Sequence, residues 1–423
     1  MIAGEERTPA AVDGLPLTRI VRPASITELQ QHVCQAASEQ QAIYAFGDGS
    51  STLLGLPARH PGVGIDLRNL NQVIDYPARD MTITVQTGIN FAPLQEILAA
   101  ENQWLPVDVP LADELTLGDA LAANYSGARR YGFGTCRDYV IGISAVNDQG
   151  MEVKAGGRVV KNVAGYDLCK LYIGSLWTLG ILTQATLKVR PRPQRSTLVG
   201  VDCPSSRLEE TLALLHKSRT RPVCITLVNQ RASAAMTGAL KEMLVADREA
   251  WLMLVGFEDN DDAVAWQVEQ VRHELRQEGL SARREWTDSD ARPLWRSLAD
   301  FPLASAAPLS VKLTVLPRLV GALCDELRTL PGEPSLQVHA GNGIVHAHLS
   351  PLKLEQAQQV LKRLVERATD GKGNVTIQRC PNEWKSSLPI WGAPRGDYAL
   401  MREIKRKLDP NGIFNPGRFV DGI

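Results

Sequence analysis

The chain has 423 residues, of which 44% are apolar and 22% charged, a composition typical of a folded globular protein and not of a disordered one. Its 46 basic and 47 acidic side chains leave a formal charge of −1, so the excess of positive charge by which proteins bind nucleic acids is missing. No apolar run approaches the ~18 residues that span a bilayer, and the first residues show no signal-peptide pattern. We therefore expect a cytoplasmic chain without a transmembrane segment, for which any association with the inner membrane would run through a partner.

The first half predicts an alternation of short strands and helices, ending at a boundary near Pro191 and Pro193. A loose lead-in covers residues 1–18. In chain order we then expect a helix over 27–40 capped by Thr27, a strand over 42–46, a strand over 81–87, a helix over 91–101 capped by Asn90, a small-residue helix over 118–124, a hairpin of 140–146 with 151–155, and a strand over 181–189.

The second half predicts strands near 196–202, 223–229 and 251–257 and helices near 205–218 and 260–279. A regular set follows, with a strand over 310–316, a helix over 318–330, a hairpin of 335–340 with 344–349, a helix over 352–368 and a strand over 374–379. This β-α-β-β-α-β order predicts a ferredoxin-like antiparallel sheet with helices on one face. A basic helix and the sequence Asn415-Pro416-Gly417 close the chain.

A glycine-rich turn, Gly47-Asp48-Gly49-Ser50-Ser51, follows the predicted strand 42–46. Such a turn directs several backbone N–H groups to one point, as the spread charge of a diphosphate requires, and glycine lets the ligand approach closely. A plain tight turn is an equally good interpretation of the loop taken alone. The chain contains neither G-x-G-x-x-G nor a Walker A loop, which argues against a Rossmann dinucleotide fold and a P-loop kinase.

Two further regions carry similar signals. The segment 116–127 is a helix of small residues that Thr116 opens and Ser126-Gly127 closes, and Asn124 and Ser126 offer hydrogen bonds to a polar ligand. A packed Ala-rich helix is the alternative interpretation. The segment 156–183 contains two glycine-bounded turns with more polar side chains than a simple connection needs.

In this order, the three regions resemble the FAD-binding domain of the vanillyl-alcohol oxidase / p-cresol methylhydroxylase (PCMH) family, and within it the FAD-binding subunits of glycolate oxidase (the GlcE type). The most specific matches are the string over 160–168, the Gly-x-x-x-Thr-Leu-Gly of 174–180 and the C-terminal Asn-Pro-Gly of 415–417. The likeness covers about residues 17–193 and the C-terminal segment, and it is loose between them.

The resemblance implies an α+β fold in which a PCMH-type FAD-binding domain of two subdomains carries a ferredoxin-like antiparallel α+β cap domain. The expected boundaries are 1–18 for the lead-in, 19–193 for the FAD-binding domain, 194–395 for the cap or substrate domain, and 396–423 for a segment that returns to the FAD-binding domain. The first glycine loop contains no histidine of the kind that binds FAD covalently in some members, so we expect non-covalent FAD.

Carried over residue by residue, the resemblance implies cofactor-binding roles for three groups of residues. They are Phe46, Gly47, Asp48, Gly49, Ser50 and Ser51 in the first region; Pro110, Leu111, Thr116, Gly118, Asp119, Asn124, Ser126 and Gly127 in the second; and Gly180 and Ile181 in the third. The chain departs from the family pattern at Leu176 and Trp177, which replace an acid and a glycine. Any cofactor contact that the family's acidic residue makes is therefore lost in this chain. Trp177 either stacks near the cofactor or packs in the hydrophobic core.

Three histidines gather in the predicted hairpin of the second half. Asn342-Gly343 favours a two-residue type I′ turn that sets His339 opposite His346, with His348 on the same face. Three imidazoles there suit a divalent metal, the orientation of a substrate carboxylate, or the removal of a proton from an α-hydroxyl. A solvated polar sheet face is the alternative. The catalytic residues stay unassigned, with these three histidines as the candidates on the substrate side.

The histidine string also resembles the His-x-Gly-Asp-Gly-Asn-x-His motif of flavin-dependent D-2-hydroxy-acid dehydrogenases, in which the histidines are metal ligands. His339 and His346 match them, but Asn342 and Ile344 replace the motif's Asp and Asn, and the later Glu-His-Gly-Ile-Gly segment is missing. We therefore predict no metal site, with His339 and His346 as weak candidates. The cations considered for a substrate carboxylate are Lys312, Arg379 and Arg395, although a solvated surface suits each of them better.

The leading hypothesis is an FAD-dependent oxidoreductase component that oxidises a small 2-hydroxy acid such as glycolate or D-lactate. The seven cysteines are scattered and form no CxxC pair, so the chain is not expected to build an iron–sulfur cluster or a disulfide framework. The resemblance then implies a hetero-oligomer with a second flavoprotein subunit and an iron–sulfur subunit that receives the electrons. The alternative is a non-catalytic FAD-binding or electron-relay subunit; a UDP-sugar-reducing enzyme of the same fold is less favoured.

Overall fold

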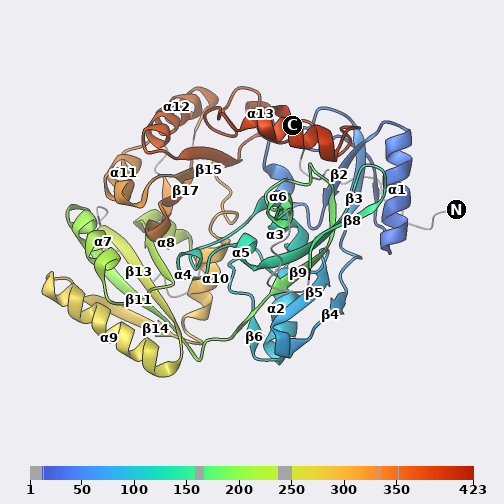
Figure 1. The fold of residues 1–423 in the computed structure, drawn as a ribbon. Helices are drawn as coiled ribbons and strands as arrows, with labels where there is room; N and C mark the ends of the chain where they lie inside the picture. Colours follow the sequence, from blue (N-terminus) through green and yellow to red (C-terminus); the bar gives the residue numbers. More distant parts are fainter. Residues whose placement is uncertain (1–11, 13, 158–165, 237–249, 332–333, 351) are drawn as a thin grey trace. The chain divides into compact units, whose positions relative to one another are not determined.

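The computed structural model describes residues 12, 14–157, 166–236, 250–331, 334–350 and 352–423, and these divide into two units (Figure 1). Unit 1 comprises residues 1–125, 135–192 and 394–423, and unit 2 comprises residues 126–134 and 193–393. Most of the 160–168 string and of the lead-in 1–18 lies outside the described residues. No helix among the described residues is long and apolar enough to cross a membrane.

Unit 1 contains two separate larger sheets, in keeping with the two subdomains expected from the sequence. The first is parallel, in the order β1 (Leu17–Val21), β3 (Gly62–Asp66), β2 (Ala42–Phe46). The second is antiparallel, in the order β4 (Val73–Asp75), β5 (Thr82–Gln86), β9 (Ile181–Lys188), β7 (Val140–Val146), β8 (Glu152–Gly156). The strands β6 (Gln103–Trp104) and β10 (Arg190–Pro191) form a short ribbon.

The helices of unit 1 are mostly short. They are α1 (Ile26–Ser38), α2 (Phe91–Ala100), α3 (Leu117–Ala123), α5 (Cys136–Tyr139), α6 (Cys169–Tyr172) and α13 (Tyr398–Leu408). The predicted cap of the first helix was wrong by two residues, because the Ser25 hydroxyl, and not that of Thr27, accepts the hydrogen bond of the Glu28 N–H. Asn90 precedes α2 as predicted, but its side chain donates to the Asp113 carbonyl.

Unit 2 is built on one eight-stranded sheet, in which β12 and β16 join two halves of the same β-α-β-β-α-β topology. The first half has β11 (Arg195–Pro204), α7 (Leu208–Lys217), β12 (Cys224–Val228), β13 (Ala250–Asp259), α9 (Asp261–Gln277) and β14 (Ala282–Thr287). The second half has β15 (Leu309–Thr314), α11 (Val320–Arg328), β16 (Ser335–His339), β17 (Ile344–Leu349), α12 (Leu354–Asp370) and β18 (Asn374–Arg379). The predicted ferredoxin-like motif is confirmed in the second half and occurs again in the first.

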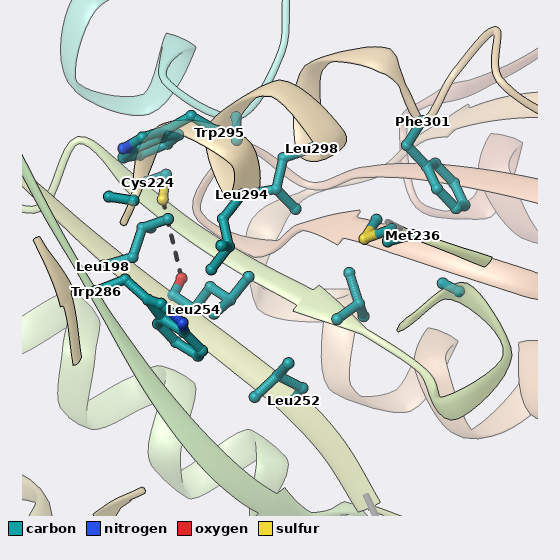
Figure 2. Packing of buried hydrophobic residues seen from close by; sticks show 14 of the residues in the cluster. Leu198, Cys224, Met236, Leu252, Leu254, Trp286, Leu294, Trp295, Leu298 and Phe301 are labelled. Atoms are coloured by element: carbon teal, nitrogen blue, oxygen red, sulfur yellow. Dashed lines mark hydrogen bonds between the residues drawn. The ribbon is translucent and has the colours of Figure 1, made fainter. Parts of the chain in front are cut away.

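The core of the first half of unit 2 lies between its strands and α10 (Arg292–Asp300), as Figure 2 shows. Leu294, Trp295 and Leu298 recur at helical spacing on α10 and pack against buried strand residues such as Cys224 and Leu254. The short helix α8 (Gln230–Ala235) adds to the same cluster through Ala232.

The segment 126–134, which includes α4 (Arg130–Phe133), belongs to unit 2 although its sequence neighbours belong to unit 1. Ala128 is part of the core cluster of unit 2. Arg129 forms a two-pronged ion pair with the buried Glu258, at 2.9 Å (Nε–Oε2) and 2.8 Å (Nη2–Oε1), and its guanidinium lies 3.8 Å from the centre of the Trp295 ring. These contacts fix the segment on the sheet of unit 2.

Candidate functional site

The glycine loop of unit 1 lies directly against the start of α3. A Cβ atom on Gly47 would lie 2.0 Å from the Thr116 Oγ1 atom and 2.4 Å from the Asp119 Oδ2 atom. Only glycine therefore fits at this position without a shift of its neighbours. Gly49 takes a left-handed conformation at φ 93°, which also favours glycine. Two of the three regions singled out in the sequence therefore meet in space.

The contact between loop and helix is centred on the Asp119 carboxylate, which is fully buried. Its Oδ2 atom accepts the backbone N–H groups of Gly47 at 2.9 Å and Asp48 at 3.0 Å and the Thr116 hydroxyl at 3.0 Å. Its Oδ1 atom accepts the Ser51 hydroxyl at 2.9 Å. Burial and the neighbouring Asp48 carboxylate raise the pKa of Asp119 to about 7. The N–H groups of the loop thus converge on a negative group, as expected for an anion-binding turn. That negative group is a side chain of the protein itself, the Asp119 carboxylate.

The third region meets α3 at the turn 174–177. The N–H groups of Gly174 and Leu176 donate to the carbonyls of Leu121 and Ala122, each at 2.9 Å. A Cβ on Gly118 would lie 2.7 Å from the Cη2 atom of Trp177, so the indole packs on the bare backbone of the helix. Leu176 and Trp177 adopt left-handed conformations at φ 50° and 62°. Such conformations are uncommon for bulky residues, and the family pattern has a glycine at the position of Trp177.

The C-terminal segment ties β2 to this turn. The Asn415 N–H donates to the Ile43 carbonyl at 2.9 Å, and the Asn415 side-chain amide donates to the Leu176 carbonyl at 2.6 Å. The buried Lys405 ammonium on α13 donates to the carbonyls of Thr178 at 2.7 Å and Phe414 at 2.8 Å and pairs with Asp409 at 2.5 Å. A small cavity lies where these parts meet, lined by Leu15, Ala45, Ser51, Thr52, Leu54, Leu176, Trp177, Asn415 and Arg418.

Four buried polar atoms around this junction have no hydrogen-bond partner among the described residues: Asn124 Oδ1, Ser175 Oγ, Trp177 Nε1 and Asn415 Oδ1. Unpaired buried polar atoms are uncommon, because each has lost its water without a replacement. Together with the anion-directed loop amides and the bare backbone at Gly47 and Gly118, they form a cradle suited to a polar nucleotide, and we call these parts the unit 1 cradle.

The other residues predicted to bind the cofactor are placed as follows. Leu111 follows Pro110 in a turn at φ 49°, and its carbonyl accepts the Leu115 N–H at 2.8 Å. Gly180 at φ 145° precedes Ile181, which pairs with Val146 at the start of β9. The structure assigns Ser126 and Gly127 to unit 2, where the Ser126 hydroxyl accepts from Arg130 at 3.1 Å.

The second group of functional side chains lies on the sheet of unit 2. His346 on β17 stands directly opposite Gln337 on β16 and Lys312 on β15. His339 stands opposite Ile344, so the predicted hairpin register, with His339 facing His346, was wrong. Residues 340–342 form a 3₁₀ turn that lengthens the connection. Because the shift is two residues, both histidines keep one face, with ring centres 5.3 Å apart.

The hydrogen bonds of these histidines define their roles. His346 Nδ1 lies 3.1 Å from the side-chain amide oxygen (Oε1) of Gln378, so Nδ1 carries the proton and Nε2 keeps its lone pair. His339 Nε2 lies 2.9 Å from the Gln337 amide nitrogen and therefore accepts, which leaves the proton on Nδ1. That Nδ1 has no partner among the described residues. The pair thus offers one acceptor and one donor.

His348 is held by hydrogen bonds within unit 2. Its Nε2 lies 2.8 Å from the Phe301 carbonyl and its Nδ1 lies 2.7 Å from the Ser310 hydroxyl, so both ring nitrogens are engaged. A solvated polar face, the alternative weighed for these histidines, is contradicted by the burial of His339, His346 and His348.

The charges near the histidine pair are positive. Burial, reinforced by Arg130 and Lys312, lowers the pKa of His339 to about 3, and burial together with His339 and Lys312 lowers the pKa of His346 well below its usual value. Burial and Arg130 lower the pKa of Lys312 to about 8. The described residues contain no group of three or more His, Cys, Asp or Glu that could hold a metal ion. A site of this charge favours an anion over a metal cation.

Of the three cations considered from the sequence, only Lys312 belongs to this cluster; it is partly buried. Arg379 donates to the Ser305 carbonyl, and Arg395 pairs with Asp397 at 2.7 Å on the surface of unit 1. Arg130, which the sequence did not single out, acts on Lys312 and His339. Its only sequence signal is its place directly after the second glycine-rich region.

Comparison with known protein families identifies the family of the chain. Residues 17–156 match the model of an FAD binding domain, and residues 190–376 and 393–419 match the C-terminal domain of FAD linked oxidases. The chain belongs to the FAD-linked oxidases. It is an FAD-dependent oxidoreductase with the PCMH-type fold expected from its sequence, and FAD is its cofactor.

Individual members of this family resemble the chain over nearly its whole length. Glycolate oxidase subunit GlcD of Bacillus subtilis (strain 168) is 23% identical, over 94% of this chain and 88% of that protein. Glycolate oxidase subunit GlcE of Escherichia coli (strain K12) is 26% identical, over 92% and 96%. Among solved structures, an alkyldihydroxyacetonephosphate synthase superposes with a TM-score of 0.70 at 20% identity, over 94% of this chain and 76% of that one, a likeness of fold.

Proposed function

We propose that this FAD-linked oxidase removes two electrons from the α-carbon of a small 2-hydroxy acid, glycolate or D-lactate, and yields the 2-oxo acid. The observation that carries the proposal is the pairing of neutral His339 and His346 with the cations Lys312 and Arg130. A 2-hydroxy acid presents a carboxylate and a neighbouring hydroxyl, the two groups that such a set of side chains recognises. The glycolate oxidase subunits among the relatives support this substrate class.

The cations bind and orient the substrate. Burial and the positive charge of Arg130 destabilise the charged ammonium form of Lys312. A substrate carboxylate next to both groups stabilises that form again, and a charge-assisted hydrogen bond of this kind contributes about 1.5–3 kcal/mol. The anion also lowers the positive potential that acts on the histidines, so it makes them better proton acceptors once the substrate is bound.

The histidines handle the hydroxyl proton. His346 Nε2 holds the lone pair that accepts this proton, and Gln378 fixes the tautomer through Nδ1. The unpaired Nδ1–H of His339 donates a hydrogen bond to the same substrate oxygen. Bound FAD supplies the acceptor for the hydride that leaves the α-carbon, so the proton and the electron pair depart separately and the reaction balances.

The electrons must then leave the chain through a partner. All seven cysteines are unpaired thiols; Cys34 is exposed and the other six are buried. We propose a hetero-oligomer with a second flavoprotein subunit and an iron–sulfur subunit. The names of the two glycolate oxidase relatives, both called subunits, support an assembly of several subunits. Co-purification of the native complex tests this, and a chain that purifies alone with full turnover would contradict it.

A second candidate function is a non-catalytic FAD-binding or electron-relay subunit. It is favoured by the Asp119 carboxylate on the loop amides and by Trp177 at a position where the family has glycine. The FAD-loaded chain, assayed with an artificial electron acceptor and either glycolate or D-lactate, separates the two candidates. Formation of glyoxylate or pyruvate supports the enzyme, and tightly bound flavin without any product supports the relay.

A further inference from the structure

We infer that the Asp119 carboxylate is an internal competitor of the FAD diphosphate: it occupies the amides of the glycine loop in the cofactor-free chain and leaves them when FAD binds. The inference rests on the proposed role of the Gly47–Ser51 loop in holding the diphosphate. It concerns how tightly, and under which conditions, this chain takes up the cofactor of its family.

The geometry of the loop carries the first step. Consecutive backbone N–H groups at Gly47 and Asp48 point to one Asp119 oxygen, at 2.9 and 3.0 Å. Successive amides that converge in this way form an anion-binding hollow, and a diphosphate oxygen uses the same donors. A donor already engaged at normal length by a carboxylate cannot serve a second anion at full strength, so the two anions exclude each other.

The remaining contacts of Asp119 strengthen this exclusion. The hydroxyls of Ser51 and Thr116 donate to the same carboxylate at 2.9 and 3.0 Å. Asp119 therefore satisfies four donors at once, and its removal from the hollow leaves all four without an acceptor until another anion arrives. The competitor is consequently well bound in the cofactor-free chain, and part of the affinity for FAD is used to displace it.

Charge carries the second step. Asp48 lies on the loop itself, where its Oδ1 atom accepts the Ser50 N–H at 3.3 Å and the Ser50 hydroxyl at 2.9 Å. Arg68 is a cation that acts on both carboxylates, and it is already bound to Asp66 at 2.7 Å. A diphosphate would thus add its own negative charges beside two carboxylates, which favours uptake of a proton by the protein on binding.

The position of that proton follows from the burial of Asp119. Its pKa of about 7 is raised by desolvation and by Asp48, so the group changes charge near neutral pH. Protonation of Asp119 removes the anion that competes with the diphosphate. It also removes part of the repulsion between the diphosphate and the two carboxylates. The affinity for FAD should therefore rise as the pH falls through about 7, and one linked proton corresponds to at most about a tenfold change per pH unit.

The test is a titration of the purified full-length chain with FAD, followed by flavin fluorescence and calorimetry at about pH 6 and about pH 8. Asp119→Asn keeps the shape of the side chain and a carbonyl acceptor but removes the charge, and Asp119→Ser shortens the side chain. Asp80→Asn is the matched control, since it removes one exposed acid of unit 1 outside the cradle.

We expect the wild type and Asp80→Asn to bind FAD up to about tenfold more tightly at the lower pH, whereas Asp119→Asn binds more tightly than wild type at the higher pH and loses the pH dependence. Weaker binding by both Asp119 variants, or an unchanged pH dependence, would overturn the inference. If neither the wild type nor any variant binds FAD at either pH, the proposed role of the loop fails together with it. Thermal unfolding with and without FAD gives an independent readout, because the stabilisation by FAD should be larger in Asp119→Asn.

Discussion

Lys312 and His346 stand directly opposite each other on the neighbouring strands β15 and β17, and the positive charge of the lysine is one reason why the imidazole stays neutral. A neutral imidazole beside a cation accepts a proton poorly until an anion binds next to both. Under the proposed function, this arrangement would couple recognition of a substrate carboxylate to the strength of the His346 base.

Replacement of Lys312 by methionine should weaken binding of the hydroxy acid. The variant keeps the aliphatic stem but loses the charge-assisted hydrogen bond to the carboxylate, so kcat/KM should fall about 10- to 100-fold, mainly through KM. Lys362→Met, on the exposed side of α12, is the control and should behave as wild type. An unchanged KM for glycolate and D-lactate would remove Lys312 from the substrate site.

Two histidine variants should separate chemistry from stability. His346→Gln loses the proton acceptor and should lower kcat about 10²- to 10⁴-fold with little effect on folding. His348→Gln disturbs a side chain held by Ser310 and Phe301 and should cost about 1–3 kcal/mol of unfolding free energy while kcat is retained. Steady-state kinetics and urea unfolding of both variants check this, and the opposite assignment of the two effects would contradict it.

Acid should destabilise the fold through the buried histidines. His339 has a pKa of about 3 when folded against 6.5 unfolded, so below pH 6.5 the unfolded chain binds a proton that the folded chain does not. Its contribution to stability is therefore present above pH 6.5 and lost as the pH falls toward 3, at up to about 1.4 kcal/mol per pH unit. Urea unfolding against pH should show a shallower slope for His339→Gln, and identical slopes would disprove the burial of a neutral His339.

The glycine at position 47 should be indispensable. A Cβ there would lie 2.0 Å from Thr116 Oγ1, so Gly47→Ala must push the loop off α3, and overpacking of this kind costs about 1–3 kcal/mol. FAD affinity should fall at least tenfold with it. Gly396→Ala, also in unit 1, meets nothing within 4 Å and is the control. Normal FAD binding by Gly47→Ala would argue against this loop as part of the cofactor site.

Lys405 should hold the C-terminal segment on the FAD-binding unit. Its ammonium pairs with the buried Asp409, whose carboxylate also accepts the N–H groups of Ile413 and Phe414. Lys405→Met leaves this acid buried without its cation, which should cost about 3–5 kcal/mol. Lys407→Met, exposed on the same helix, should cost little. Chemical unfolding measures both, and equal effects would show that the ion pair is not required.

The sequence patterns predicted the second half of the unit 2 sheet well but missed the identical topology before it. The edge strand β14 is the cause: Arg283, Arg284 and Glu285 are exposed there, so the strand shows no apolar run, and only Trp286 is buried. The predicted hairpin register was wrong because Asn342-Gly343 belongs to a longer turn. The preference of an Asn-Gly pair for two-residue turns does not predict that longer turn.

At the sites, local sequence identified which segments meet but not what fills the space between them. Glycine at 47 and 118 indicates close approach, and both glycines do contact another segment. The engagement of the loop amides by Asp119 depends on a side chain 72 positions away from Gly47, and the burial of Lys312 depends on strand pairing. Neither feature has a local signal, because both arise from long-range packing.

The most direct test of the proposed function is anaerobic mixing of the FAD-loaded chain, within its native complex, with glycolate or D-lactate while the absorbance of oxidised flavin is followed. We predict loss of this absorbance in the wild type, much slower loss in His346→Gln, and no loss with a simple alcohol that lacks the carboxylate. Flavin that stays oxidised with both hydroxy acids, yet is reduced at once by a chemical reductant, would contradict hydroxy-acid oxidation by this chain.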